Sequence, residues 1–172
     1  GDVAMVWIDA HPDITLPGDP YPGYHAMAVT ACMGHGDAKI VAELPAAFDP
    51  SKILFVGLRN WERGEIKARQ HQYGIKHLTP EEVAADSDAL RAWLKSCGAS
   101  KVVVHFDMDV LDPAEIVAAV GTDPDGMKIE AVIRVINDIA AEKELVGLTV
   151  AEPMPRTAIR LRDMLGRLPL LE

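Results

Sequence analysis

Two acidic motifs in this sequence each follow an apolar run typical of a buried β-strand. In WIDAHPD, the side chains of Asp9, His11 and Asp13 are expected to project to one side as the strand enters its loop. In HFDMDVLDP, Asp107 and Asp109 share a face by the same rule. Clustered carboxylates repel one another unless cations neutralise them. Mixed oxygen and nitrogen donors suit manganese, and iron or cobalt are possible, so the sequence predicts a metal site.

Each motif alone has a simpler interpretation. A single aspartate at the end of a strand is commonly a loop or helix cap, and Asp112-Pro113 by itself would be a turn. Both motifs together, following two strands of one chain, favour metal binding over capping.

The elements that must position these motifs alternate along the chain. β-branched, apolar runs predict strands over Val3–Asp9, Lys52–Leu58, Gly74–Leu78, Lys101–Asp107 and Leu145–Ala151. Between and after them, helices are predicted over Glu62–Tyr73, Pro80–Cys97, Lys128–Glu144 and Thr157–Leu168. Repeated βα units predict an α/β fold with a mainly parallel sheet and helices on both sides. Ligands of such sheets bind beyond the carboxyl ends of the strands, where the acidic motifs lie.

Capping signals support the second predicted helix. Thr79 is placed as its N-cap, with Pro80 at the first helical position and Glu82 three residues after the cap. Gly98 is a plausible stop just beyond Cys97.

Composition narrows the class of protein. The 172 residues suit one domain, and 49% hydrophobic and 25% charged residues are ordinary for a soluble protein. A net charge of −9 argues against general binding to nucleic acid or anionic membranes. We find no membrane-spanning or signal-peptide pattern in the sequence. Cys32 and Cys97 form no disulfide framework or zinc set, so we expect a reducing, cytoplasmic location.

DAHPD and FDMDVLDP, followed by VAEPMP, resemble the ureohydrolase family of arginase, agmatinase and formimidoylglutamase. Softer matches in VGLRNWERGE, YGIKHLTPEEV and AVGTDPDGM extend the resemblance over nearly the whole chain. The resemblance implies a three-layer αβα sandwich whose site holds two manganese ions bridged by a hydroxide. It also implies hydrolysis of a guanidino or formimino C–N bond in a small substrate, with urea as a product, and assembly into trimers or hexamers.

The resemblance assigns the metal ligands residue by residue. Asp9 and Asp107 correspond to the carboxylates that bridge both metals. Asp13 corresponds to a ligand of one metal, and His11 and Asp109 to ligands of the other. Asp109 would also accept a hydrogen bond from the bridging hydroxide.

Three further residues match positions that handle substrate and protons. Glu152 corresponds to the carboxylate that holds the guanidinium, His25 to a histidine that shuttles protons, and Glu62 to an acid that contacts the substrate's amino group. The catalytic set implied is therefore Asp109, His25 and Glu152. Each of the three also has a plain alternative: a helix-capping acid, a solvated loop histidine and a surface acid in the first turn of a helix.

The sequence departs from the family in two places. A histidine ligand in an upstream Gly-rich motif is absent, so we expect residues 1–172 to be a single ureohydrolase domain lacking its N-terminal strands. His105 shares a face with Asp107 but sits deeper in the strand, so we do not expect it to replace this ligand. The loop ITLPGDPYPGYHAM has Thr15 but no Asn or Ser, which argues against the usual recognition of L-arginine.

Two other functions stay open at this point. A family member with a degraded metal site could act as a non-catalytic binding or assembly subunit. A deacetylase of related fold fits less well, because Asp107, Asp109 and Glu152 match a dinuclear site.

Overall fold

The computed structural model describes residues 1–21, 23–154 and 158–171. Five strands form one sheet: β1 (Val3–Ile8), β2 (Ile53–Val56), β3 (Lys76–Leu78), β4 (Lys101–Asp107) and β5 (Glu144–Ala151). Their order is β3-β2-β1-β4-β5, and every neighbouring pair is parallel. The predicted parallel sheet is therefore confirmed, with strand ends that differ from the predicted ones by at most two residues.

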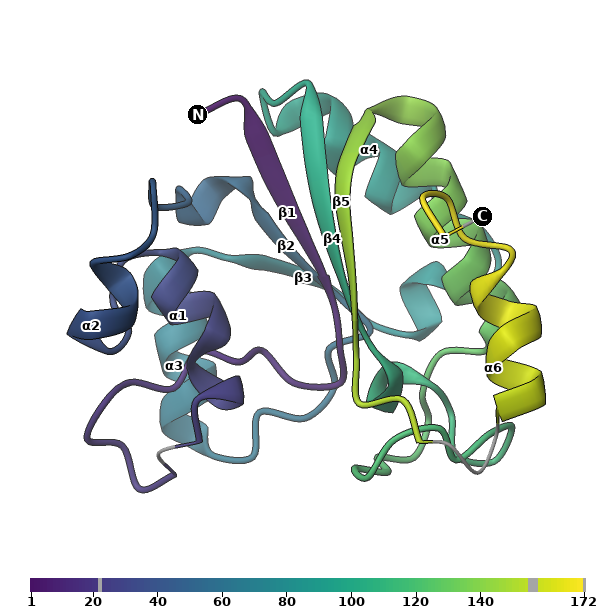
Figure 1. Ribbon diagram of the computed structural model, residues 1–172, viewed down its shortest axis with the longest axis horizontal. Helices are drawn as coiled ribbons and strands as arrows, with labels where there is room; N and C mark the ends of the chain where they lie inside the picture. Colours follow the sequence, from purple (N-terminus) through teal and green to yellow (C-terminus); the bar gives the residue numbers. More distant parts are fainter. Residues whose placement is uncertain (22, 155–157, 172) are drawn as a thin grey trace.

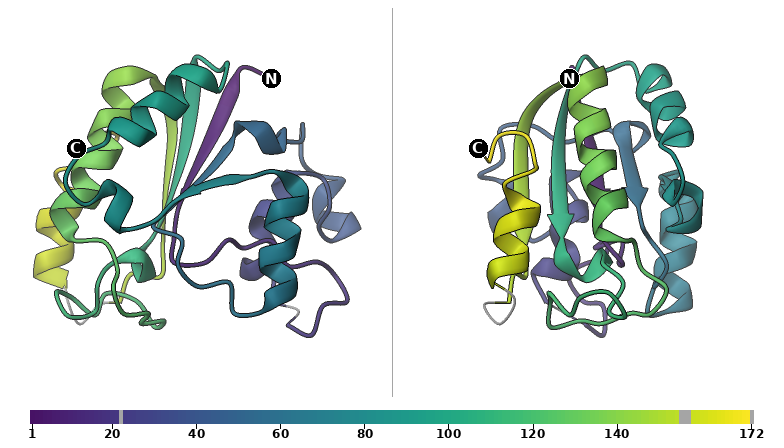
Figure 2. Two further views of the ribbon diagram at one scale, coloured as in Figure 1. Left: turned by 180° about the vertical axis from the view of Figure 1, so that it is seen from behind. Right: turned by 90° about the vertical axis from the view of Figure 1, so that its right-hand side faces the viewer.

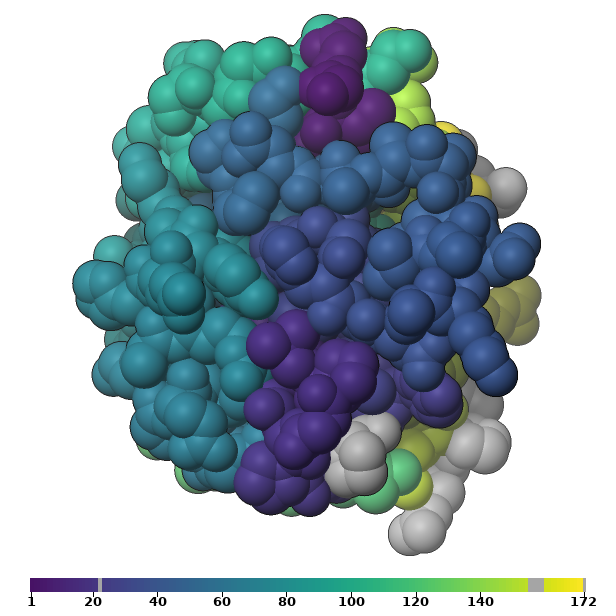
Figure 3. All heavy atoms as spheres, turned by 90° about the vertical axis from the view of Figure 1, so that its left-hand side faces the viewer, coloured from purple at the N-terminus to yellow at the C-terminus, as the bar shows by residue number. Residues whose placement is uncertain are grey.

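Helices cover both faces of this sheet (Figure 1). One layer contains α1 (Ala28–Cys32), α2 (Ala38–Val41) and α3 (Gly64–Tyr73), and Figure 3 views the molecule from that side. The other layer contains α4 (Asp88–Ser96), α5 (Ile129–Glu142) and α6 (Ala158–Leu165), which face the viewer in the right-hand view of Figure 2. The fold is the expected three-layer αβα sandwich.

The two faces of β1 contribute to two separate hydrophobic cores. Val6 and Ile8 are fully buried in the core beneath α4 and α5. Met5 and Trp7 point the other way and pack with Ile66 of α3. Burial of each large side chain contributes about 1.5–3 kcal/mol, so β1 is held firmly from both sides. The residues that follow Ile8 therefore begin from a rigid position.

The predicted helix Pro80–Cys97 is wrong as a single element. The expected capping pair forms, since the Thr79 amide donates to the Glu82 carboxylate at 2.8 Å, but it caps only a 3₁₀ turn over Glu81–Val83. The helix is interrupted after this turn. The next helix, α4, begins at Asp88, whose amide donates to the Asp86 side chain. The Arg134 guanidinium of α5 binds the backbone carbonyls of Val83, Ala84 and Asp86. This long-range cation stabilises the break because it satisfies carbonyls that a continuous helix would have used.

Other element boundaries differ less. Gly98 has φ +69° directly after Cys97 and ends α4 as predicted, because glycine adopts the left-handed region without strain. The first predicted helix begins at Gly64 instead of Glu62, and α5 ends at Glu142 because Lys143 is already extended. The last helix spans Ala158–Leu165, and its predicted start at Thr157 lies outside the described residues. The sequence predicts no helix where α1 and α2 form. Among the described residues, no helix is long and apolar enough to cross a membrane.

Candidate metal centre and active site

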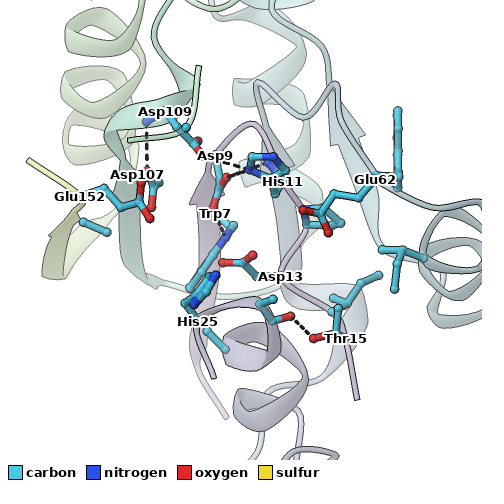
Figure 4. Close-up of a pocket in the computed structure, with 18 of the residues that line it drawn as sticks. Trp7, Asp9, His11, Asp13, Thr15, His25, Glu62, Asp107, Asp109 and Glu152 are labelled. Atoms are coloured by element: carbon cyan, nitrogen blue, oxygen red, sulfur yellow. Dashed lines mark hydrogen bonds and ion pairs between the residues drawn. The ribbon is translucent and has the colours of Figure 1, made fainter. Parts of the chain in front are cut away.

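The carboxyl ends of β1 and β4 meet because these two strands are neighbours in the sheet. A cavity of about 360 Å³ opens at this edge. It is lined by every residue that the sequence places in the site: Asp9, His11, Asp13, His25, Glu62, Asp107, Asp109 and Glu152. Figure 4 shows Asp9, His11 and Asp109 close together, with Glu152 and Glu62 on opposite sides of them in this view.

His11 lies at the centre of the cluster. Its Nδ1 is 3.0 Å from Asp109 Oδ2 and 3.5 Å from Asp9 Oδ1. One donor atom from each of these residues lies within 4.8 Å of the others. Two buried carboxylates and an imidazole that converge in this way are a suitable donor set for a divalent metal.

Asp107 takes part in two further groups with the same spacing. One combines it with Asp9 and His105, and the other with Asp109 and Glu152. Because adjacent groups share carboxylates, the three groups together form one continuous cluster of oxygen and nitrogen donors. Asp13 lines the same cavity, but among the described residues it joins none of these groups.

Burial makes the charged form of these carboxylates costly. It raises the pKa of Asp107 to about 8 and that of Asp9 to about 6, and it raises the pKa of Asp13 well above its usual value. Nearby carboxylates, Asp9 for Asp107 and Asp109 for Asp9, push these pKa values in the same direction. These carboxyl groups therefore tend to keep their protons, and a bound cation would offset the cost of their charged form.

The pKa values of His11 and Asp109 shift in the directions that favour their charged forms. Burial alone would lower the pKa of His11, but the carboxylates of Asp109 and Asp9 raise it to about 11. Burial alone would raise the pKa of Asp109, but the hydrogen bond from His11 lowers it. Without a metal, a protonated His11 thus supplies the positive charge that Asp109 requires.

Short hydrogen bonds hold the carboxylates in place. Trp7 Nε1 donates to Asp9 Oδ2 at 3.0 Å, and the His11 amide donates to Asp9 Oδ1 at 2.7 Å. The Ala10 amide donates to Asp109 Oδ1 at 3.2 Å. Asp107 accepts from the Asp109 amide at 3.0 Å in the 3₁₀ turn Met108–Val110. These donors come from the loop backbones and from β1, so the folded sheet itself orients the cluster.

Backbone strain is concentrated at this cavity. Asp13, Glu62 and Glu152 line it and have φ values of +48°, +57° and +57°. Residues other than glycine rarely adopt this left-handed backbone region, which costs about 1–2 kcal/mol per residue. Among the described residues, Asp125 and Leu170 are the other non-glycine residues with positive φ. Strain of this kind commonly persists where function requires a particular side chain.

Thr15 lines the cavity, but its side chain bonds to its own loop. Its hydroxyl donates to the carbonyl of Ala26 at 2.8 Å and is buried, so the hydroxyl's proton is already used within the loop. His25 is exposed and starts a 3₁₀ turn, with Nε2 3.1 Å from the hydroxyl of Tyr21. Glu62 precedes α3 instead of forming its first turn.

Sequence reasoning missed Asp123. This residue lies in the loop between β4 and α5, and its Oδ2 is 3.2 Å from His11 Nε2. With Asp123, the described lining of the cavity contains seven acidic residues. The same lining contains no lysine or arginine. The match of AVGTDPDGM to the family pointed to this loop, but the local spacing carried no signal for a contact with a residue 112 positions earlier in the chain.

The fold and this cluster define an α/β protein with a carboxylate-rich site at the carboxyl edge of a parallel sheet. Residues 1–163 match the family model described as "Arginase family". An arginase of Entamoeba histolytica is 29% identical over 159 residues, which cover 90% of this chain and 53% of the relative. An arginase of Saccharomyces cerevisiae is 27% identical over 170 residues, which cover 92% of this chain and 51% of the relative. The chain therefore belongs to the arginase family.

Solved structures agree on the fold. The crystal structure of Entamoeba histolytica arginase in complex with L-ornithine matches with a TM-score of 0.86 and 23% identity, covering 97% of this chain and 60% of that chain. Formimidoylglutamase from Bacillus subtilis matches with a TM-score of 0.71 and 17% identity, covering 91% of this chain and 47% of that one. The chain thus spans about half the length of the curated relatives that it matches.

Proposed function

We propose that the full-length protein carrying this chain is a dinuclear metal hydrolase that cleaves a guanidino or formimino C–N bond in a small substrate. The observation that carries the proposal is the convergence of Asp9, His11, Asp107 and Asp109 in one cavity of an arginase-family fold. Manganese is the preferred metal in this proposal, because the donors are mainly carboxylate oxygens with one imidazole nitrogen.

The donor set fits two ions. Asp9 and Asp107 would be shared between them, as the family resemblance implies, and both belong to two of the close groups of donors, as Asp109 also does. His11 and Asp109 would hold one ion, and Asp13 the other. Two such cations lower the pKa of water enough to supply hydroxide at neutral pH.

The remaining residues would bind the substrate and move protons. Glu152 would hold the planar guanidinium through charge-assisted hydrogen bonds, which are stronger than neutral ones. Asp109 would accept the proton that the attacking water group releases, and His25 would donate one to the leaving amine. The excess of acidic residues around the cavity would attract a cationic substrate.

The charges in the described lining of the cavity favour one kind of substrate tail. A carboxylate tail requires positive groups or free hydroxyl and amide donors. The described lining has no lysine or arginine, and the Thr15 hydroxyl already donates to Ala26. Glu62 offers a negative charge instead, which would pair with an amine. We therefore propose a guanidino amine such as agmatine as a better substrate than L-arginine.

A metal and product assay tests this function. The full-length protein would be stripped of metal, reloaded with Mn²⁺, Fe²⁺ or Co²⁺, and assayed for urea or formamide release from agmatine, L-arginine and N-formimino-L-glutamate. We expect two Mn²⁺ per chain and the highest kcat/KM with agmatine, and Asp109→Asn should abolish turnover. A fully metal-loaded protein that releases neither product would instead favour a non-catalytic subunit. Assembly into trimers or hexamers is proposed on the family alone, and sedimentation of the same sample would measure it.

A further inference from the structure

The two ring nitrogens of His11 face different partners. Nδ1 faces Asp109 and Asp9, the donors of the metal cluster, at 3.0 and 3.5 Å. Nε2 faces away from that cluster and lies 3.2 Å from Asp123 Oδ2. A neutral imidazole carries one N–H, and the partner of that N–H determines which nitrogen keeps a free lone pair for a metal. The position of Asp123 therefore bears directly on how His11 binds a metal.

Asp123 is itself held in place. Asn60 Nδ2 donates to Asp123 Oδ1 at 2.8 Å, which leaves Oδ2 directed at His11. Asn60 is fixed in turn, because its Oδ1 accepts from the Glu62 amide at 2.7 Å. The side chain of Asp123 is 25% exposed, so it is shielded from solvent on most sides.

Arg59 connects the same loops through their backbones. Its Nη2 donates to the carbonyls of Asp123 and Asp109 at 2.8 and 3.0 Å. The amides of Arg59 and Asn60 both donate to the carbonyl of Ala10, the residue before His11. The segment after β2 thus holds His11, Asp109 and Asp123 at fixed separations.

We propose that Asp123 is a positioning residue that accepts a hydrogen bond from His11 Nε2–H and thereby presents the Nδ1 lone pair of His11 to a divalent cation. A carboxylate or carbonyl in this role both fixes the tautomer and makes the imidazole a better ligand. Asn60 orients Asp123, and its Nδ2 also lies 3.5 Å from His11 Nε2, farther away than the Asp123 Oδ2 atom. The inference rests on the proposed function only in requiring that His11 binds a metal, and not on any hydrolytic activity.

Metal affinity in paired variants tests this role. Mn²⁺ binding to the metal-free full-length protein would be measured by calorimetry for the wild type, Asp123→Asn, His11→Ala and the double variant. We expect Asp123→Asn to weaken one Mn²⁺ site about 10- to 100-fold, the usual effect of losing such a partner. In the His11→Ala background the same change should have no further effect, because Asp123 acts only through His11.

Two controls separate positioning from general structural damage. Asp125→Asn removes a charge in the same loop, and Asp125 is not among the described partners of the His11 side chain, so it should leave Mn²⁺ affinity unchanged. The ¹⁵N signals of the His11 ring in the Zn²⁺-loaded protein should show a protonated Nε2 in the wild type and loss of the single tautomer in Asp123→Asn. If Asp123→Asn unfolds, Asn60→Ala provides a second, milder test with the same expected direction.

The outcomes distinguish this inference from the proposed function. Unchanged Mn²⁺ affinity in Asp123→Asn, combined with loss of one site in His11→Ala, would overturn the role of Asp123 and leave the metal site intact. An equal loss from Asp123→Asn with and without His11 would make Asp123 a direct ligand, which also overturns the proposal. If His11→Ala keeps both ions, the proposed metal centre itself is wrong.

Discussion

The indole of Trp7 lies flat against the imidazole of His105, with ring centroids 3.7 Å apart and an angle of 17° between the rings. The same indole donates its Nε1–H to Asp9. Burial lowers the pKa of His105 to about 4, so this histidine is neutral at physiological pH and brings no positive charge to the cluster. The stack therefore fixes the indole, and the indole orients a proposed metal ligand.

Replacing Trp7 with phenylalanine should separate these two roles. Trp7→Phe keeps an aromatic ring against His105 but removes the donor to Asp9, so we expect Mn²⁺ affinity to fall by roughly tenfold. Trp93→Phe is the control, since Trp93 lies in the core on the other face of the sheet. Calorimetric titration of the metal-free protein measures the affinity. Equal affinities in Trp7→Phe and the wild type would show that the hydrogen bond does not support metal binding.

Glu152→Gln should lower turnover while the metal content stays close to two ions per chain. A neutral amide cannot pair with a guanidinium, and loss of a charged hydrogen bond of about 1.5–3 kcal/mol corresponds to a roughly 10- to 100-fold lower kcat/KM. Urea release and metal analysis on the same preparation provide the measurement. Since Glu152 also lies close to Asp107 and Asp109, loss of metal in this variant would reassign it as a ligand.

Glu62→Gly should stabilise the fold while it weakens substrate binding. Glu62 has φ +57°, which glycine adopts without strain, so we expect a gain of about 0.5–1 kcal/mol in the free energy of unfolding. The KM for agmatine should rise in the same variant, because the proposed partner of the amine is lost. Glu65→Gly within α3 is a matched control and should destabilise the protein, because glycine weakens a helix. Chemical denaturation and steady-state kinetics test both parts.

The metal-free protein should become less stable as pH rises. Asp107 has a folded pKa of about 8 against the model-compound value of 3.8, so the folded state retains a proton that the unfolded state has lost between these values. The free energy of unfolding therefore falls as pH rises through this window. His11, with a pKa raised from 6.5 to about 11, adds stability below 6.5 that is lost as pH rises toward 11.

Chemical denaturation in EDTA at pH 5.5 and pH 8.5 measures this dependence. We expect greater stability at pH 5.5, and Asp107→Asn should flatten the curve because the group that titrates is gone. Addition of Mn²⁺ should restore stability at pH 8.5, where the carboxylates are ready to bind it. Higher stability of the metal-free protein at pH 8.5 than at pH 5.5 would contradict the buried charge cluster.

Arg59→Lys should destabilise the protein although the charge is kept. The Arg59 guanidinium donates to five backbone carbonyls, those of Gly57, Asp109, Val110, Asp123 and Pro124. An ammonium group cannot reach all of them, so we expect a loss on the order of 3 kcal/mol in the free energy of unfolding. Arg160→Lys, which removes an exposed hydrogen bond to the backbone carbonyl of Glu115, should change stability by less than about 0.5 kcal/mol. A similar small change for Arg59→Lys would show that these loops are held by other contacts.

Local patterns in the sequence were sufficient for the sheet and for most of the proposed site. Apolar, β-branched runs such as Lys101–Asp107 predict a strand covered on both faces, and the acidic motifs directly follow such strands. Parallel strands then bring Asp9 and Asp107 to one edge without any further information. These features depend on neighbouring residues and on the side-chain period of a strand, both of which are visible in one dimension.

The tertiary structure decided the contacts between distant loops. Arg134 of α5 stabilises the break in the predicted helix Pro80–Cys97, and Asp123 reaches His11 across the cavity. The strained backbone of Glu62 likewise depends on the loop around it, since Asn60 holds its amide. No local period encodes these features, because each depends on where packing of the two helix layers places a loop relative to the sheet. The sequence by itself therefore determined that the acidic motifs after β1 and β4 meet at one edge of the sheet, and only the folded loops decided how these side chains are oriented and that Asp123 joins them.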